Sequence, residues 1–199
     1  MRLAKLLSIF IVCGLSVGCG LFQNEPFEPD VNAAEPRFNS SGKIDLKVNK
    51  IDVISEFTPS FRRPNVEHLF PISIEKTARL WAQDRLEAVD FSSRKQAQVI
   101  IKDASVTEEL EPVDNFFEKD RIKYRAVLNM AIRIVDDNDL SSAGTEVEAW
   151  QELVIPADTS IEDKEKHWNE MVYKLFNAFN QRIDYNIHKY LSAYIANAE

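Results

Sequence analysis

Few residues of this sequence belong to the types that carry enzyme chemistry. The histidines His68, His167 and His188 are widely spaced along the chain, and both cysteines, Cys13 and Cys19, lie among the first twenty residues. A structural zinc site needs four such ligands at short spacings or brought together by the fold. These side chains show no such spacing, so the sequence predicts no metal site and no cofactor.

Glycine-dependent active-site motifs are also missing from the sequence. The chain holds only five glycines, with no Gly-x-Ser-x-Gly turn to present a nucleophilic serine and no glycine-rich loop to bind a phosphate. We therefore expect a protein that is not an enzyme. A hydrolase with an unrecognised site stays open as the weakest alternative.

The thiol of Cys19 follows a segment with the pattern of an export signal. Arg2 and Lys5 precede a mostly apolar run over 6–17, and Gly18 stands directly before the cysteine. As a helix this run would rise about 18 Å, less than the roughly 30 Å of a bilayer core. We therefore interpret residues 1–18 as a signal peptide that is removed.

The segment Leu15-Ser16-Val17-Gly18-Cys19 resembles the bacterial lipobox. This resemblance implies that a lipid is attached to Cys19 and anchors the processed chain in a membrane. Ser16 departs from the pattern, which usually has leucine there, and an ordinary secreted protein with an incidental cysteine is the alternative. In lipoproteins of diderm bacteria, Asp after the cysteine favours the inner membrane. Gly20 here implies the periplasmic face of the outer membrane.

The composition indicates a folded acidic domain behind a tether. The chain is 45% hydrophobic and 28% charged, with a formal net charge of -8, so it can bury a core but repels nucleic-acid phosphates. We expect no nucleic-acid partner. Pro26, Pro29 and Pro36 interrupt a stretch without periodicity, which predicts a lipid anchor and flexible tether over 19–42 and a domain over 43–199.

Hydrophobic periodicity predicts four strands and two helices. Strands are expected over 44–53, with a bulge near Asn49, and over 99–106, 122–134 and 147–155, with a hairpin loop at Asp136–Gly144. Ser73 should cap a helix over 74–89, and Ser160 with Asp163 a long helix to about residue 194. The predicted fold is α+β in the order β-α-β-β-β-α. A four-stranded, mostly antiparallel sheet would carry both helices on one face, with its first two strands parallel neighbours.

Two segments are candidates for contact with a protein partner. The first is a proline-bounded loop that mixes aromatic and cationic residues, namely Phe57, Phe61, Arg62, Arg63, His68 and Phe70. Its aromatic rings could contact a partner or fix the loop to the core, and both interpretations stay open. The second is the end of the last helix, where Tyr185, Tyr190, Tyr194 and Ile195 recur at helical spacing as either core or binding surface.

Three segments carry a wider resemblance: Pro64–Pro71, Ala78–Leu86 and Ile101–Val106. They are similar to a group of uncharacterised lipoproteins from alphaproteobacteria. More remotely, the leader and element order resemble lipopolysaccharide-assembly lipoproteins and auxiliary lipoproteins of lipid-exporting ABC systems. This resemblance implies a non-enzymatic envelope lipoprotein that assists outer-membrane assembly or lipid transport through contacts with a protein partner. The alternative is a periplasmic carrier or sensor that binds a lipid or another apolar ligand.

Overall fold

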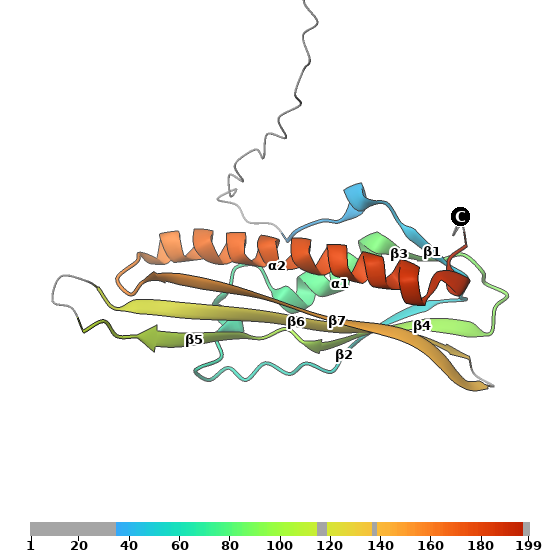
Figure 1. Ribbon diagram of the computed structural model, residues 1–199, viewed down its shortest axis with the longest axis horizontal. Helices are drawn as coiled ribbons and strands as arrows, with labels where there is room; N and C mark the ends of the chain where they lie inside the picture. Colours follow the sequence, from blue (N-terminus) through green and yellow to red (C-terminus); the bar gives the residue numbers. More distant parts are fainter. Residues whose placement is uncertain (1–34, 115–118, 137–138, 197–199) are drawn as a thin grey trace, which may run out of the picture.

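The computed structural model describes residues 35–114, 119–136 and 139–196, and two helices lie above a long twisted sheet in it (Figure 1). In chain order the elements are η1 (Asn39–Ser41), β1 (Ile44–Leu46), β2 (Ile51–Ser55), η2 (Glu67–Leu69), α1 (Ile74–Arg85), β3 (Leu86–Ala88), β4 (Lys95–Asp103), β5 (Val106–Glu111), β6 (Arg121–Asp136), β7 (Asp139–Pro156), α2 (Ile161–Tyr190) and η3 (Ser192–Tyr194). The α+β class predicted from the sequence is confirmed.

The large sheet is organised around β6. On one edge, β4 and β5 pair one after the other with the two halves of β6, and β7 pairs antiparallel with it along the other edge. β2 extends the sheet beyond β4, and these two strands are parallel, as expected for strands joined through a helix. β1 and β3 form a separate parallel pair. The large sheet therefore has five strands rather than the four predicted.

The predicted strand over 44–53 is in fact two strands in different sheets. β1 pairs with β3, the chain turns at 47–50, and β2 pairs with β4. The strand predicted over 99–106 is likewise divided into β4 and β5. In both cases the alternation slips by one residue, which a bulge and a break between strands produce equally.

Two predicted element ends were wrong because strand pairing extends beyond the hydrophobic pattern. The helix ends at Arg85 rather than 89, since Leu86–Ala88 pairs with Ile44–Leu46. The predicted loop Asp136–Gly144 is largely strand, because β6 continues to Asp136 and pairs there with Asp139. The first of these pairings joins residues far apart in the sequence, so a local pattern carries no information about it.

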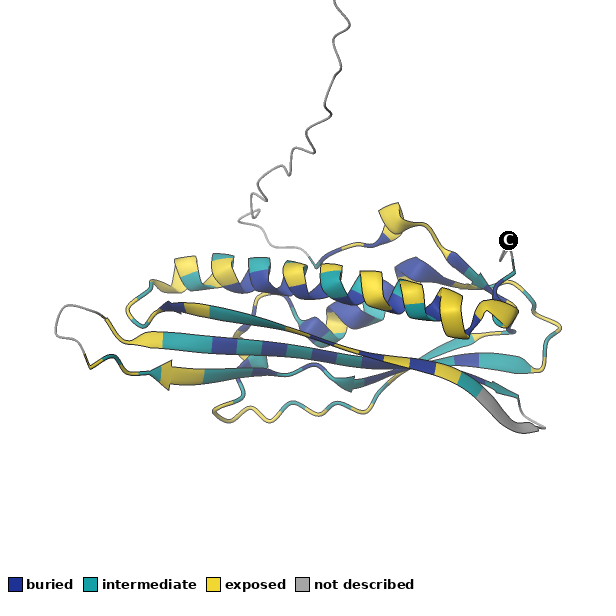
Figure 2. Ribbon diagram, viewed as in Figure 1, coloured by how far each residue is buried: buried dark blue, intermediate teal, exposed yellow. Residues whose placement is uncertain are grey.

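Both predicted helix starts are confirmed. Ser73 Oγ accepts a hydrogen bond from the backbone N–H of Lys76 at 3.2 Å, and Ser160 Oγ accepts one from Asp163 N at 3.2 Å. Each bond satisfies a backbone donor that the first helical turn leaves unpaired. Figure 2 shows α2 buried on the side that faces the sheet and exposed on the other.

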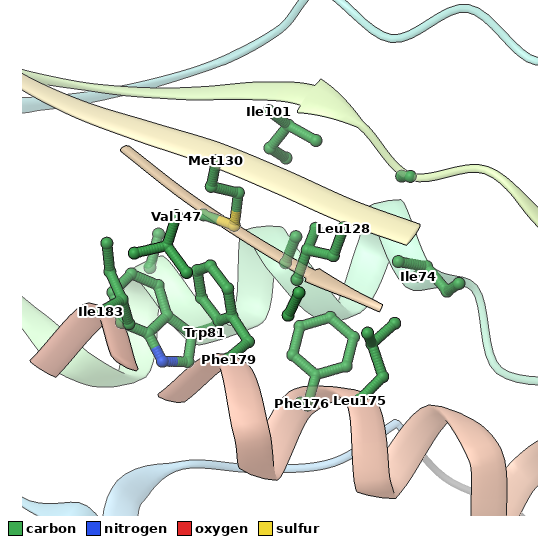
Figure 3. Packing of buried hydrophobic residues seen from close by; sticks show 14 of the residues in the cluster. Ile74, Trp81, Ile101, Leu128, Met130, Val147, Leu175, Phe176, Phe179 and Ile183 are labelled. Atoms are coloured by element: carbon green, nitrogen blue, oxygen red, sulfur yellow. The ribbon is translucent and has the colours of Figure 1, made fainter. Parts of the chain in front are cut away.

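The core fills the space between the sheet and the two helices (Figure 3). The rings of Trp81 on α1 and Phe179 on α2 pack edge to face, with centroids 5.3 Å apart. The indole Nε1 of Trp81 donates to Asn180 Oδ1 at 2.8 Å, which satisfies the polar end of a fully buried side chain. β6 supplies alternate inward residues such as Leu128 and Met130 to the same cluster.

Part of the segment expected as tether packs against the domain. Asp84 on α1 accepts hydrogen bonds from Arg37 Nε at 2.8 Å and from the backbone N–H of Phe38 at 2.9 Å. Phe38 is buried against Phe176, with ring centroids 5.7 Å apart. The pKa of Asp84 lies below its usual value because the Arg37 guanidinium hydrogen-bonds to the carboxylate. The expected signal peptide, Cys19 and the rest of the tether to residue 34 lie outside the described residues.

Candidate interaction surface on the loop between β2 and α1

The loop over 56–73, which runs from β2 to α1, continues the pairing of β2 with β4 for one residue and then lies along the free edge of β5. Its backbone N–H groups at Glu56 and Val66 donate to the carbonyls of Ile101 and Val106, each at 2.8 Å, and Pro64 O accepts from Glu108 N at 2.8 Å. In Figure 1 it is the long teal segment below the sheet. The backbone of this loop is therefore held at both ends of residues 57–63 by ladder-like hydrogen bonds.

Two of the six predicted contact residues fix the loop to the core. Phe70 is buried, and its ring stacks on Trp168 of α2 with centroids 4.8 Å apart. Tyr124 of β6 packs edge to face on both of these rings. Phe57 is half-buried against the same core. For Phe57 and Phe70 the structure therefore favours the interpretation that the ring holds the loop in place.

Phe61 is presented quite differently. Its side chain is 67% exposed, and its backbone φ of 54° lies in the left-handed region. That conformation costs a residue with a β-carbon about 1–2 kcal/mol. Nearby, Glu67 Oε1 accepts from the backbone N–H of Ser60 at 3.2 Å, and the His68 ring lies 5.5 Å from that of Phe61. The fold thus holds an exposed aromatic ring at an energetic cost.

The cationic residues beside Phe61 are exposed, and one of them is connected to the core. Arg62 and Arg63 both face solvent, and Arg63 Nη1 lies 3.1 Å from Glu108 Oε1. The carboxylate of Glu108 also accepts from the phenol of Tyr124. Burial raises the pKa of Tyr124, and this hydrogen bond raises it further. Arg63 therefore has a carboxylate partner that is itself connected to the core, while its own side chain stays 80% exposed.

A small cleft opens beside Phe61. It holds about 200 Å³, and four of the predicted residues line it: Phe57, Phe61, His68 and Phe70. Glu67 also lines it, and its Oε2 is buried with no hydrogen-bond partner within the described part of the chain. Pockets for drug-sized ligands measure about 300–1,000 Å³. The cleft is the size for one side chain of a partner.

The second predicted contact segment, at the end of α2, also contains both buried and exposed residues. Ile195 is buried, whereas Tyr185 and Tyr190 are 62% and 54% exposed. The ammonium group of Lys189 lies over both tyrosine rings, 5.5 Å and 5.1 Å from their centroids. Phe91, which is 81% exposed in the turn between β3 and β4, was not among the residues predicted from the sequence. A single phenylalanine between polar residues gives no periodic signal that could have identified it.

Within its described residues, the structure shows neither a metal-binding cluster nor a membrane-spanning helix. Among 35–114, 119–136 and 139–196, no three His, Cys, Asp or Glu side chains gather closely enough to hold a metal ion. Over the same ranges, no helix is both long and apolar enough to span a bilayer.

Comparisons with known proteins find structural similarity alone. No family model and no curated protein matches the sequence. Among solved structures, the chain is similar to a minor lipoprotein from Acinetobacter baumannii, with 11% identity, a TM-score of 0.39 and coverage of 71% of this chain and 94% of that chain. It is also similar to the rare lipoprotein B from Shewanella oneidensis (8% identity, TM-score 0.23, 68% and 99% covered) and to a neuraminyllactose-binding hemagglutinin homolog from Helicobacter pylori (13%, 0.25, 70% and 88%). Values this low assign neither a family nor an activity to the chain.

Proposed function

We propose that the protein is a non-enzymatic lipoprotein of a diderm cell envelope. In this proposal a lipid on Cys19 anchors it to the periplasmic face of the outer membrane, and the domain acts as an accessory component of outer-membrane assembly or lipid transport. The lipobox-like segment before Cys19 supports the anchor. The contact with a protein partner is supported by the loop between β2 and α1.

One observation carries the partner contact: Phe61 is exposed on a backbone that is both ordered and strained. Residues held in a left-handed conformation persist only where the surrounding structure imposes it, and they are concentrated at functional sites. Aromatic and arginine side chains are also the types that contribute most to binding at protein interfaces. The group of Phe61, Arg62 and Arg63, here named the Phe61 loop, combines these features.

The alternative function, a carrier of an apolar ligand, finds less support. Such a carrier needs an apolar cavity large enough to bury most of its ligand. In the described part of the chain, the space between sheet and helices is filled by fully buried side chains, which include Trp81, Phe176 and Phe179. The packing therefore favours a protein that acts through its surface.

The test is photocrosslinking in intact cells from a reactive amino acid at position 61. We expect one envelope protein to be crosslinked at this position and lost when Arg62 and Arg63 are both replaced by Ala. The matched control places the same probe at Ile161, an exposed apolar residue at the start of α2. Identical products from both positions, or none from position 61, would contradict the proposed partner contact.

A further inference from the structure

The turn between β3 and β4 carries Phe91, which at 81% is the most exposed large apolar side chain among the described residues. Val89, at the start of the same turn, is 40% exposed. Neither belongs to the Phe61 loop. The turn protrudes at the end of the molecule where the described chain also ends (Figure 1), so it offers its apolar residues to a surface rather than to a ligand enclosed by the domain.

The turn is held rigidly by its own polar residues. Asp90 Oδ1 accepts from Ser92 Oγ at 2.7 Å and from Ser92 N at 3.2 Å, and Asp90 O accepts from Ser93 N at 3.0 Å. The backbone N–H of Asp90 in turn donates to Val48 O at 3.2 Å. Because these bonds fix the turn before it meets anything, little conformational entropy remains to be lost when Phe91 is buried against a partner.

The same end of the domain carries the exposed tyrosines of α2. Val89 N donates to Leu46 O at 3.0 Å, and Lys47 N donates to Tyr194 O at 2.7 Å. The turn is thus connected through β1 to the segment that follows α2. There the ammonium of Lys189 lies over the rings of Tyr185 and Tyr190, as described above. Figure 1 shows the last turns of α2 and the β3–β4 turn at one end of the molecule.

We propose that this surface, formed by Val89, Phe91, Tyr185, Lys189 and Tyr190 and here named the Phe91 end, binds the headgroup region of a lipid bilayer. Phenylalanine partitions into the acyl boundary, tyrosine is enriched at the membrane–water interface, and a lysine ammonium can reach lipid phosphates while its stem lies on apolar surface. The Phe91 end provides all three kinds of side chain, from the β3–β4 turn and from the last turns of α2, which lie at the same end of the domain.

A bilayer is the expected partner of the Phe91 end because of the length of chain between Cys19 and the domain. This inference rests on the proposed lipid anchor. The described part begins at Glu35, sixteen residues after Cys19, and a fully extended chain of that length spans about 55 Å. α2 is about 45 Å long. The tether is therefore long enough for the Phe91 end to reach the membrane, and a lipid on Cys19 would keep the bilayer at a high effective concentration.

The experiment uses the full chain with its lipid, incorporated in vesicles of phosphatidylethanolamine and phosphatidylglycerol. A polarity-sensitive fluorophore is attached to a cysteine in the variant Phe91→Cys, and the matched control is Phe61→Cys. In the processed chain the thiol of Cys19 carries the lipid, so the introduced thiol is the only free one. We expect a blue-shifted probe shielded from aqueous iodide at position 91, and an unshifted, fully quenched probe at position 61.

Two outcomes separate this proposal from the lipid anchor. If the chain floats with the vesicles but both probes are equally quenched, the bilayer contact of the Phe91 end is wrong while the anchor stands. If the variant Cys19→Ala floats as the unsubstituted chain does, the anchor at Cys19 is wrong, and the probes at positions 91 and 61, placed in a chain without other cysteines, still decide the contact. Unchanged circular dichroism in both cysteine variants excludes misfolding as the cause.

Discussion

The Phe61 loop and the Phe91 end each expose a phenylalanine, but they hold it in different ways. Phe61 has a positive φ in a loop whose backbone is bonded to the sheet on either side of it, at Glu56 and Pro64, whereas Phe91 lies in a turn fixed by the side chain of Asp90. Among the described residues other than glycine, Phe61 alone has a positive φ. Exposure by itself costs a folded domain little, so the strain at Phe61 is the stronger sign of a selected contact. Phe91 gains its significance from its neighbours.

The largest expected loss of unfolding free energy comes from removing Phe70, the buried ring that fixes the Phe61 loop to the core. Phe70→Ala deletes the ring that stacks on Trp168 and leaves a cavity beneath the Phe61 loop. Replacing a buried phenylalanine by alanine typically lowers the free energy of unfolding by about 3–5 kcal/mol. We expect this loss in urea unfolding. A probe at position 91 should keep its vesicle signal at low denaturant. A loss below about 1 kcal/mol would mean that Phe70 does not fix the loop.

A smaller effect is expected at Asp84, which binds Arg37 and the backbone of Phe38 outside both regions. Asp84→Ala leaves the backbone N–H of Phe38 without its acceptor, which should cost about 1–3 kcal/mol of unfolding free energy. The pKa of Asp84 is lowered in the folded state by Arg37. Its contribution is therefore present above the usual aspartate value of about 3.9 and is lost as the pH falls through the lowered pKa.

Urea unfolding of both chains at several acidic pH values measures this difference. The gap in unfolding free energy between wild type and Asp84→Ala should be constant near neutral pH and close below about pH 4. A gap that stays constant throughout the acid range would show that the carboxylate is not selectively stabilised in the folded protein. Asp114→Ala, which removes an exposed aspartate after β5, is the matched acidic control.

Glycine at the two phenylalanine positions should have effects of opposite sign relative to alanine. At a left-handed φ, glycine avoids the steric cost that any β-carbon brings, so Phe61→Gly should be more stable than Phe61→Ala by about 1 kcal/mol. At position 91 no positive φ is present, and Phe91→Gly should be less stable than Phe91→Ala by a few tenths of a kcal/mol to about 1 kcal/mol. The same sign at both positions would remove the distinction between the two regions.

The parts of the fold that could be predicted from the sequence are those determined by residues close together in the chain. β6 was predicted well because inward residues such as Leu128, Met130 and Ile132 alternate without interruption, and both serine caps were identified because capping is local. The division of the first strand and the early end of α1 depend on pairing between β1 and β3, which are far apart in sequence.

The candidate site was predicted only as a segment. Aromatic and cationic composition indicated the loop over 57–70, but composition could not separate Phe70, which packs on Trp168, from Phe61, which faces solvent. That separation depends on which backbone groups pair with β5 and on the φ of a single residue. Phe91 was missed since one apolar residue in a polar turn is ordinary in sequence. Only its place at the end that also carries Lys189 and two tyrosines gives it meaning.

The smallest expected effect tests how each phenylalanine is held. Asp90→Ala removes two exposed side-chain hydrogen bonds of the β3–β4 turn, and Glu67→Ala removes the one that orders Ser60 beside Phe61. Each should lower the unfolding free energy by about 0.5–1 kcal/mol. Each substitution should affect binding only at its own region. Asp90→Ala should weaken the shielding of a probe at position 91 and leave the crosslink at position 61, whereas Glu67→Ala should do the reverse. Loss of both signals in either variant would show that the two regions act as one surface.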